Sequence, residues 1–234
     1  MKNTILLLLL FSLIACQKQV TNLEPAASND FTFQISTKQN LIDSEYYRNY
    51  SLKNYLTNGN FGIGTLNGVD GELIILDGIA YRVDYNGKVN RPELTKNIPF
   101  GNIKFFVADT TFFFSSDSLD KFKEKIQPLM KSEIAAIKVT GKFNFLKTRS
   151  VPKQPPHGKT LAEIIAVQNI FEFKNIEATL VGFYISDQLD KLNFPGFHLH
   201  SLLNDKTGGG HLLDCVFDSV QVQIDFSDGL KILF

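Results

Sequence analysis

Short apolar runs separated by turn-forming residues recur along much of the chain, a pattern typical of β-strands. In the N-terminal half the apolar runs are short and are separated by turn-forming pairs such as Asp77-Gly78 and Asn86-Gly87. Such pairs between apolar runs indicate β-hairpins. The strands predicted here span residues 61–66, 72–76, 79–83, 103–107 and 111–114.

The C-terminal half contains longer alternating segments. Residues 135–145 place Ile137, Val139, Phe143 and Phe145 on one face, as in a long half-buried strand. Further strands are predicted at 171–173, 177–185, 197–203, 211–217 and 220–226. Residues 148–157 contain prolines and are predicted as a connection carrying Arg149. We therefore expect a boundary near 146–158 between two sheet-based halves.

Helical spacing is limited to three segments. Residues 44–57 and 160–167 are predicted as helices, and a third begins near Ser118 with the apolar stripe Leu119, Phe122, Ile126 and Met130. Asp117 or Ser118 would cap this third helix. Many strands with a few short helices predict an α+β fold of two sheet-based halves with mixed, mostly antiparallel strands.

The N-terminal residues have the pattern of a secretory signal. Lys2 precedes an apolar region of Ile5 to Phe11 with Leu13 and Ile14, which is too short for a membrane span. Leu13-Ile14-Ala15-Cys16 resembles a bacterial lipobox, which implies cleavage before Cys16 and lipid attachment to its thiol. The alternative is an ordinary signal peptide. We expect an exported, membrane-anchored lipoprotein (periplasmic or cell surface), a flexible tether over 16–39 and a domain over 40–234.

Charge and cysteine content exclude some classes of protein. The chain has 24 basic and 24 acidic residues, and loss of residues 1–15 removes one lysine and no acid, giving 23 − 24 = −1. No basic field is present to attract nucleic acid. With Cys16 used for lipid, Cys215 is the remaining cysteine, so no intrachain disulfide forms. Cys215 lies in an apolar run and is predicted to be a small buried hydrophobe.

Three of the four histidines lie close together in the sequence. His198 and His200 share one face of a predicted strand, because side chains alternate with period two. A turn-rich loop over 204–210 would return the chain, so that His211 opens a neighbouring strand and faces the pair. Three imidazoles on one face suit a catalytic zinc site, or another late divalent metal. The alternative is a set of hydrogen-bonded surface histidines.

Three other residues are weaker candidates. Arg149 is placed to clamp a carboxylate, Glu72 opens a strand, and Thr65 lies on a glycine-containing strand that a ligand could approach. Each also has an ordinary interpretation: a surface ion pair, a solvated acid and a tightly packed strand. Gly62-x-Gly64 lacks the third glycine of a dinucleotide-binding loop, and no Gly-x-Ser-x-Gly elbow is present.

These residues together resemble a known family. Segments 61–73, 147–154, 181–184, 195–200 and 209–211 are similar, in the same order, to segments of acetolactate decarboxylases. The similarity runs from about residue 40 to the C-terminus. It implies a two-part structure with mixed sheets, often dimeric. It also implies zinc on His198, His200 and His211, with Glu72, Arg149 and Thr65 lining the pocket.

The resemblance implies a reaction as well. Zinc would stabilise an enediolate formed when 2-acetolactate loses CO₂ on its way to acetoin. Arg149 would position the carboxylate or the enediolate, and Glu72 would deliver or relay the proton.

The resemblance also has a departure. Relatives generally carry a further glutamate in a C-terminal tail, with no counterpart here, so we expect water in that position or reduced activity. The alternatives are a non-catalytic surface lipoprotein that binds zinc or a hydroxy acid, and a zinc hydrolase with Glu72 as base.

Overall fold

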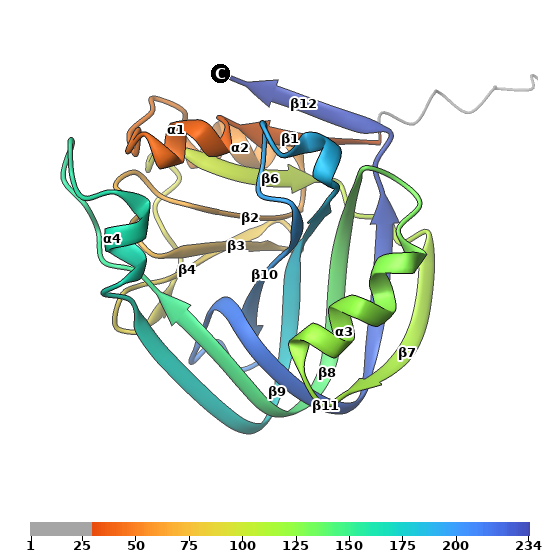
Figure 1. Cartoon of the computed structure of the whole chain (residues 1–234). Helices are drawn as coiled ribbons and strands as arrows, with labels where there is room; N and C mark the ends of the chain where they lie inside the picture. The colour runs from red at the N-terminus through yellow and green to blue at the C-terminus, as the bar shows by residue number, and fades with distance from the viewer. Residues whose placement is uncertain (1–29) are drawn as a thin grey trace, which may run out of the picture.

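Two β-sheets form the framework of the protein (Figure 1). The computed structural model describes residues 30–234, so the predicted signal peptide, the lipobox cysteine Cys16 and most of the predicted tether lie outside the described residues. Across 30–234, no helix combines the length and the apolar composition needed to cross a membrane.

The first sheet has seven strands in the order β12-β1-β6-β2-β3-β4-β5. Neighbouring strands are antiparallel except β1 and β12, which pair in parallel. The strands are β1 (Phe31–Ile35), β2 (Phe61–Thr65), β3 (Glu72–Leu76), β4 (Ile79–Val83), β5 (Val89–Asn90), β6 (Phe100–Lys104) and β12 (Gly229–Leu233). Turns with positive φ at Asp77 and Gly78 allow β3 and β4 to form a tight hairpin.

The second sheet has five antiparallel strands in the order β10-β9-β8-β11-β7. They are β7 (Thr110–Ser116), β8 (Ile134–Ser150), β9 (Asn169–Ile185), β10 (Gly196–Leu203) and β11 (Gly209–Phe226). In Figure 1, β8, β9 and β11 curve together around the lower part of the molecule. A further pairing of β10 with β11 closes β8, β9, β10 and β11 into a ring.

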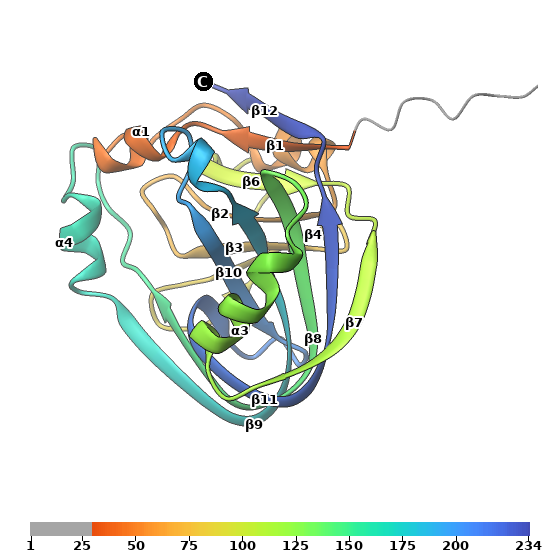
Figure 2. The same cartoon turned by 45° about the vertical axis from the view of Figure 1, so that its right-hand side comes forward.

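The helices are short and lie against the sheets. They are α1 (Lys38–Ile42), α2 (Leu52–Tyr55), α3 (Leu119–Ile126) and α4 (Leu161–Ile165), with 3₁₀ turns at Leu56–Asn58, Gln127–Leu129 and Asp187–Leu189. Ser118 caps α3 by accepting a hydrogen bond from the backbone N–H of Lys121, as predicted. Figure 2 shows α3 beside the curved strands, where its buried face packs against the core of the five-stranded sheet.

A shared apolar core joins the two sheets. Phe61 and Ile74 of the seven-stranded sheet pack in one cluster with Val181 and Phe183 of the five-stranded sheet. Burying these side chains together fixes β3 close to β9 and β10. This packing brings the start of β3 to the histidine-bearing strand β10.

The predicted fold class is confirmed: the structure is mostly strands in two sheets, mixed and antiparallel, with few short helices. Several predicted boundaries were wrong. Pairing with distant strands extends the observed elements beyond the residues whose local sequence pattern predicted them. The predicted tether residues 31–39 contain β1 and begin α1. The predicted connection 148–157 begins inside β8. The predicted strands 171–173 and 177–185 are parts of one continuous strand, β9. The predicted strands 211–217 and 220–226 are likewise parts of β11.

Two further differences concern the extent of one predicted helix and the point at which the chain passes between the two sheets. Helical structure in 44–57 is limited to α2 and the following 3₁₀ turn. The Asn67 side chain accepts from the backbone N–H of Arg48 and donates to its carbonyl oxygen, which holds Arg48 in an irregular segment. The chain passes from the first sheet to the second between β6 and β7, rather than at 146–158, and returns in β12.

Candidate active site

Three histidine side chains converge where β10 and β11 meet. His198 and His200 lie two residues apart on β10, and His211 on β11 is directly opposite His200 in the strand register. The Nε2 atom of His198 lies 3.2 Å from Nδ1 of His211 and 3.2 Å from Nε2 of His200. The structure therefore brings the three predicted ligands together, as the spacing and the hairpin suggested.

Strand register also places Arg149 beside the histidines. Arg149 on β8 is the register partner of His211, which is in turn the partner of His200. Side chains at aligned positions of neighbouring strands share a face of the sheet. Gly210 makes this close approach feasible, because a Cβ there would lie 2.5 Å from the carbonyl oxygen of Arg149, and its φ is +129°.

The histidines are poised to bind a cation. His200 is 1% exposed, and its Nδ1–H donates to the carbonyl oxygen of Leu73 at 3.0 Å, which leaves the lone pair of Nε2 facing the cluster. Burial, and then the positive charge of Arg149, lowers the pKa of His198 to about 4. Burial also holds the pKa values of His200 and His211 well below the ordinary range, so all three rings are neutral at pH 7.

The donor set fits a late divalent metal ion. The three ligand atoms lie within 4.8 Å of one another. A tetrahedral ion with Zn–N bonds of about 2.0–2.1 Å separates its ligand nitrogens by about 3.3 Å. The two nitrogen separations of 3.2 Å match that spacing, and neutral imidazole is the form that binds metal. Zinc fits this site, as do other ions that prefer imidazole.

Glu72 and Arg149 form a buried ion pair next to the histidines. The guanidinium Nη1 of Arg149 donates to Oε1 of Glu72 at 2.8 Å, and the two side chains are 13% and 7% exposed. The other carboxylate oxygen lies 3.4 Å from Nε2 of His200. Burial raises the pKa of Glu72, and the charge of Arg149 opposes that rise. Glu72 is therefore not a solvated acid, and the ion pair of Arg149 does not lie on the surface.

Thr65 lies at the end of β2 and lines the same cavity. Its hydroxyl donates to the carbonyl oxygen of Gly71 at 2.7 Å. This bond ties β2 to the residue that precedes Glu72. Thr65 thus helps to fix the turn from which the Glu72 side chain enters the cavity.

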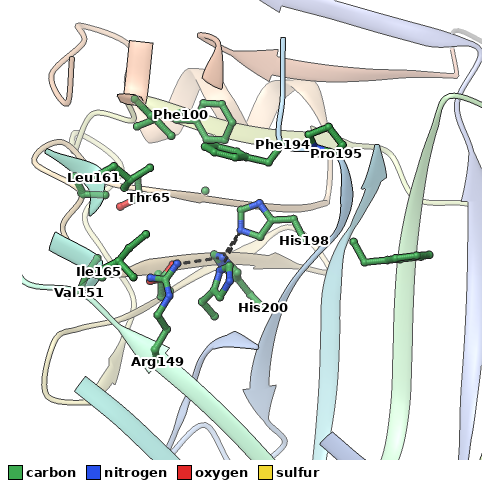
Figure 3. A pocket seen from close by; sticks show the side chains of 16 residues that line it. Thr65, Phe100, Arg149, Val151, Leu161, Ile165, Phe194, Pro195, His198 and His200 are labelled. Carbon is green, nitrogen blue, oxygen red and sulfur yellow. Dashed lines mark hydrogen bonds and ion pairs between the residues drawn. The ribbon is translucent and has the colours of Figure 1, made fainter. Parts of the chain in front are cut away.

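All these side chains face one cavity of about 260 Å³ (Figure 3). Among the residues lining it, the charged side chains are those of Glu72 and Arg149. Figure 3 shows Val151, Leu161 and Ile165 across the cavity from His198. The apolar lining comprises Leu41, Val69, Phe100, Val151, Leu161, Ile165, Phe194, Pro195 and Phe197.

Sequence reasoning did not identify this apolar lining. Its residues come from α1, the β2–β3 turn, β6, the residue after β8, α4, and β10 with the segment before it, which are far apart in the chain. A single apolar residue on a short helix has the same local pattern whether it faces the core or a ligand. The tertiary arrangement alone brings them together.

Comparison with known proteins identifies the family. The family model for alpha-acetolactate decarboxylase matches residues 32–234. The alpha-acetolactate decarboxylase of Methanosarcina mazei is 33% identical over 216 residues, covering 90% of this chain and 75% of the relative. That of Brevibacillus brevis is 36% identical over 204 residues, covering 86% of this chain and 71% of the relative.

Solved structures agree with the sequence comparisons. The alpha-acetolactate decarboxylase of Bacillus subtilis superimposes with a TM-score of 0.83 at 30% identity, over 86% of this chain and 88% of that one. A Staphylococcus aureus protein described as similar to alpha-acetolactate decarboxylase gives a TM-score of 0.84 at 29% identity, over 87% and 89% of the two chains. This chain therefore belongs to the alpha-acetolactate decarboxylase family of enzymes.

Proposed function

We propose that this enzyme converts 2-acetolactate to acetoin and CO₂ in the cavity between its two sheets, with a zinc ion held by His198, His200 and His211. The observation that carries the proposal is the meeting of three neutral imidazoles with a buried Arg149–Glu72 pair in one cavity. A small acid that carries a ketone and a hydroxyl group matches this combination of polar groups and apolar wall.

The reaction requires a place for negative charge and a source of one proton. The bond between the carboxylate carbon and the adjacent carbinol carbon breaks, and its electron pair moves toward the ketone oxygen. A bound divalent cation would supply Lewis-acid stabilisation of that charge. Arg149 adds a fixed positive charge on the same side of the cavity, and its guanidinium N–H groups can orient the substrate carboxylate.

Glu72 is the group in the cavity that can hold and deliver the proton. Burial raises the pKa of Glu72, which favours the protonated carboxyl, while the positive charge of Arg149 lowers it and favours the carboxylate. A carboxyl group under these two opposing effects suits a residue that both gives up and regains a proton. Protonation of the carbon that lost CO₂ completes acetoin.

The apolar lining supports the same proposal. Side chains such as Phe100, Val151 and Leu161 surround the space next to the polar groups and would exclude water from it. Exclusion of water strengthens the electrostatic interactions of Arg149 and Glu72 with developing charge.

The test is product formation by purified, zinc-loaded protein. We expect acetoin and CO₂ from acetolactate, and about one zinc ion per chain. His200→Ala should lose most of the zinc and the acetoin, whereas His157→Ala, which alters an exposed histidine, should keep both.

Two other outcomes would identify the alternatives. Zinc-loaded protein that releases no acetoin would favour a non-catalytic binding protein. Cleavage of a simple ester such as 4-nitrophenyl acetate without acetoin formation would favour a zinc hydrolase.

A further inference from the structure

Three buried side-chain amides form a network behind the apolar wall of the cavity. Gln34 lies on β1, Asn102 on β6 and Asn193 in the segment before β10, and they are 0%, 2% and 1% exposed. The Nδ2 group of Asn193 donates to Oε1 of Gln34 at 2.8 Å and to Oδ1 of Asn102 at 3.0 Å. Asn102 Nδ2 donates to the same Gln34 oxygen at 3.2 Å. Buried amides are costly unless they are paired, so removing one member leaves the others unsatisfied.

The network ties the segment before β10 to the seven-stranded sheet. Gln34 Nε2 donates to the carbonyl oxygen of Leu192 at 2.9 Å, and the backbone N–H of Lys38 donates to the same oxygen at 3.0 Å. The Oδ1 atom of Asn193 accepts from the backbone N–H of Phe194 at 2.7 Å. Asn193 therefore bonds on one side to the sheet and on the other to the next residue of the segment.

Phe194 forms part of the cavity wall. Its ring packs edge-on against Phe100, with centroids 6.0 Å apart, and both rings line the cavity above His198 in Figure 3. Phe100 lies on β6, two residues before Asn102, so the same strand supplies a network member and the ring that supports Phe194.

The histidines are held by different contacts. Residues of β10 pair with β9 along the whole strand, with His198 opposite Phe183 and His200 opposite Val181. His200 also donates to Leu73 on β3. The position of the metal ligands is thus set by the strand ladder and not by the amide network.

We infer that Asn193 is a positioning residue for substrate binding, which acts through Phe194 to fix the apolar wall facing the alkyl groups of the substrate. This inference rests on the proposed function. Substrate affinity then depends on Asn193, whereas metal binding depends on the strand pairing of β10.

The test is a double-mutant cycle of Asn193→Ala and Phe194→Ala, read as KM and kcat for acetolactate at equal zinc content. Asn193→Ala removes the buried hydrogen bonds of this side chain and should raise KM about tenfold, with kcat changed less than about threefold. In the Phe194→Ala background, Asn193→Ala should add no further rise in KM. Zinc content should remain that of the wild type in all three variants.

The control is Asn60→Ala, which removes a similar bond, donated by the backbone N–H of Phe106 to Oδ1 of Asn60, away from the cavity. It should lower stability without changing KM. Equal KM effects in Asn60→Ala and Asn193→Ala, additive effects in the double variant, or loss of zinc would overturn the inference. If Asn193→Ala does not fold, Asn102→Ala removes one acceptor of Asn193 and should raise KM about threefold.

Absence of turnover in the wild type would refute the proposed function and not this inference. The readout is then the Kd of 2-hydroxyisobutyrate, a non-decarboxylating hydroxy acid, measured by calorimetry on zinc-loaded protein. A loss of affinity in Asn193→Ala that disappears in the Phe194→Ala background supports the inference. An unchanged Kd, or no binding to the wild type, contradicts it.

Discussion

At the scale of single residues, burial determines what Arg149 and Glu72 can do. In water an exposed pair of this kind contributes little, whereas a buried charge that loses its partner is strongly unfavourable. The 2.8 Å bond between them therefore gives each group a partner inside an apolar cavity. Neither residue could be assigned this role from its local sequence, because the Arg149–His211 register depends on pairing between distant strands.

We predict that Arg149→Lys lowers kcat/KM by about 10²-fold, because lysine keeps the charge but lacks the planar fork that orients a carboxylate. Zinc content should not change. The measurement is steady-state acetoin formation, with Arg91→Lys as the control because Arg91 is exposed and does not line the cavity. A kcat/KM within twofold of the wild type in Arg149→Lys would rule out the orienting role of the guanidinium.

Cys215 should be unreactive in the folded protein. It is fully buried, and burial raises the pKa of its thiol to about 12. At pH 8 the thiolate fraction is then on the order of one in 10⁴. In a Cys16→Ser background, we expect no reaction with a thiol reagent such as DTNB at pH 8, and full reaction after unfolding in guanidinium chloride.

The same shift has a defined effect on stability. The pKa of the Cys215 thiol is higher in the folded protein than in the unfolded chain. Its contribution to the free energy of unfolding is therefore fully present below about pH 9 and is lost as the pH rises through about 12. Rapid labelling of the native protein at pH 8 would contradict the buried position of this thiol.

At the scale of elements, sequence patterns predicted short hairpin strands and helix α3 well. Two short apolar runs around a two-residue turn were sufficient for β3 and β4, and Ser118 with its apolar stripe was sufficient for α3. The long strands β9 and β11 were divided in the prediction, because their local breaks are bridged by pairing with β8. The positive φ of Asn175 shows that β9 continues through a locally unusual conformation.

The packing of α3 gives a prediction for stability. Phe122 is fully buried and stacks edge-on with Phe114 and Phe217, at centroid distances of 5.9 and 5.6 Å. Phe122→Ala should lower the free energy of unfolding by about 3–5 kcal/mol. Chemical denaturation followed by circular dichroism measures this change, with Phe113→Ala as the control because that ring is 72% exposed. A loss below 1 kcal/mol in Phe122→Ala would show that α3 is not part of the cooperative core.

At the scale of the whole molecule, the histidine cluster was predictable and the rest of the cavity was not. His198, His200 and His211 are joined by one hairpin, so their spacing carries the information. The apolar wall depends on how α1, α4 and the segment before β10 pack against both sheets. Thr65, Glu72 and Arg149 were weak candidates from their positions in the sequence, and it was the resemblance to the family that implied their place in the pocket.

The lipobox-like sequence at residues 13–16 predicts where the protein is located in the cell. We propose that Cys16 carries a lipid that anchors the exported protein to a bacterial membrane. In a bacterial host, the wild type should partition into detergent and carry the mass of attached acyl chains, whereas Cys16→Ser should do neither. Membrane-associated, acylated Cys16→Ser protein would refute the anchor.

In the proposed reaction, Glu72 transfers a proton next to a metal held by three histidines. The most direct measurement compares acetoin formation by the wild type and Glu72→Gln at equal zinc content. Glutamine is nearly isosteric but carries no acidic proton, so we predict that kcat falls by about 10²–10⁴-fold while zinc is retained. Equal kcat values for the two proteins, or a wild type no faster than His200→Ala, would contradict this account.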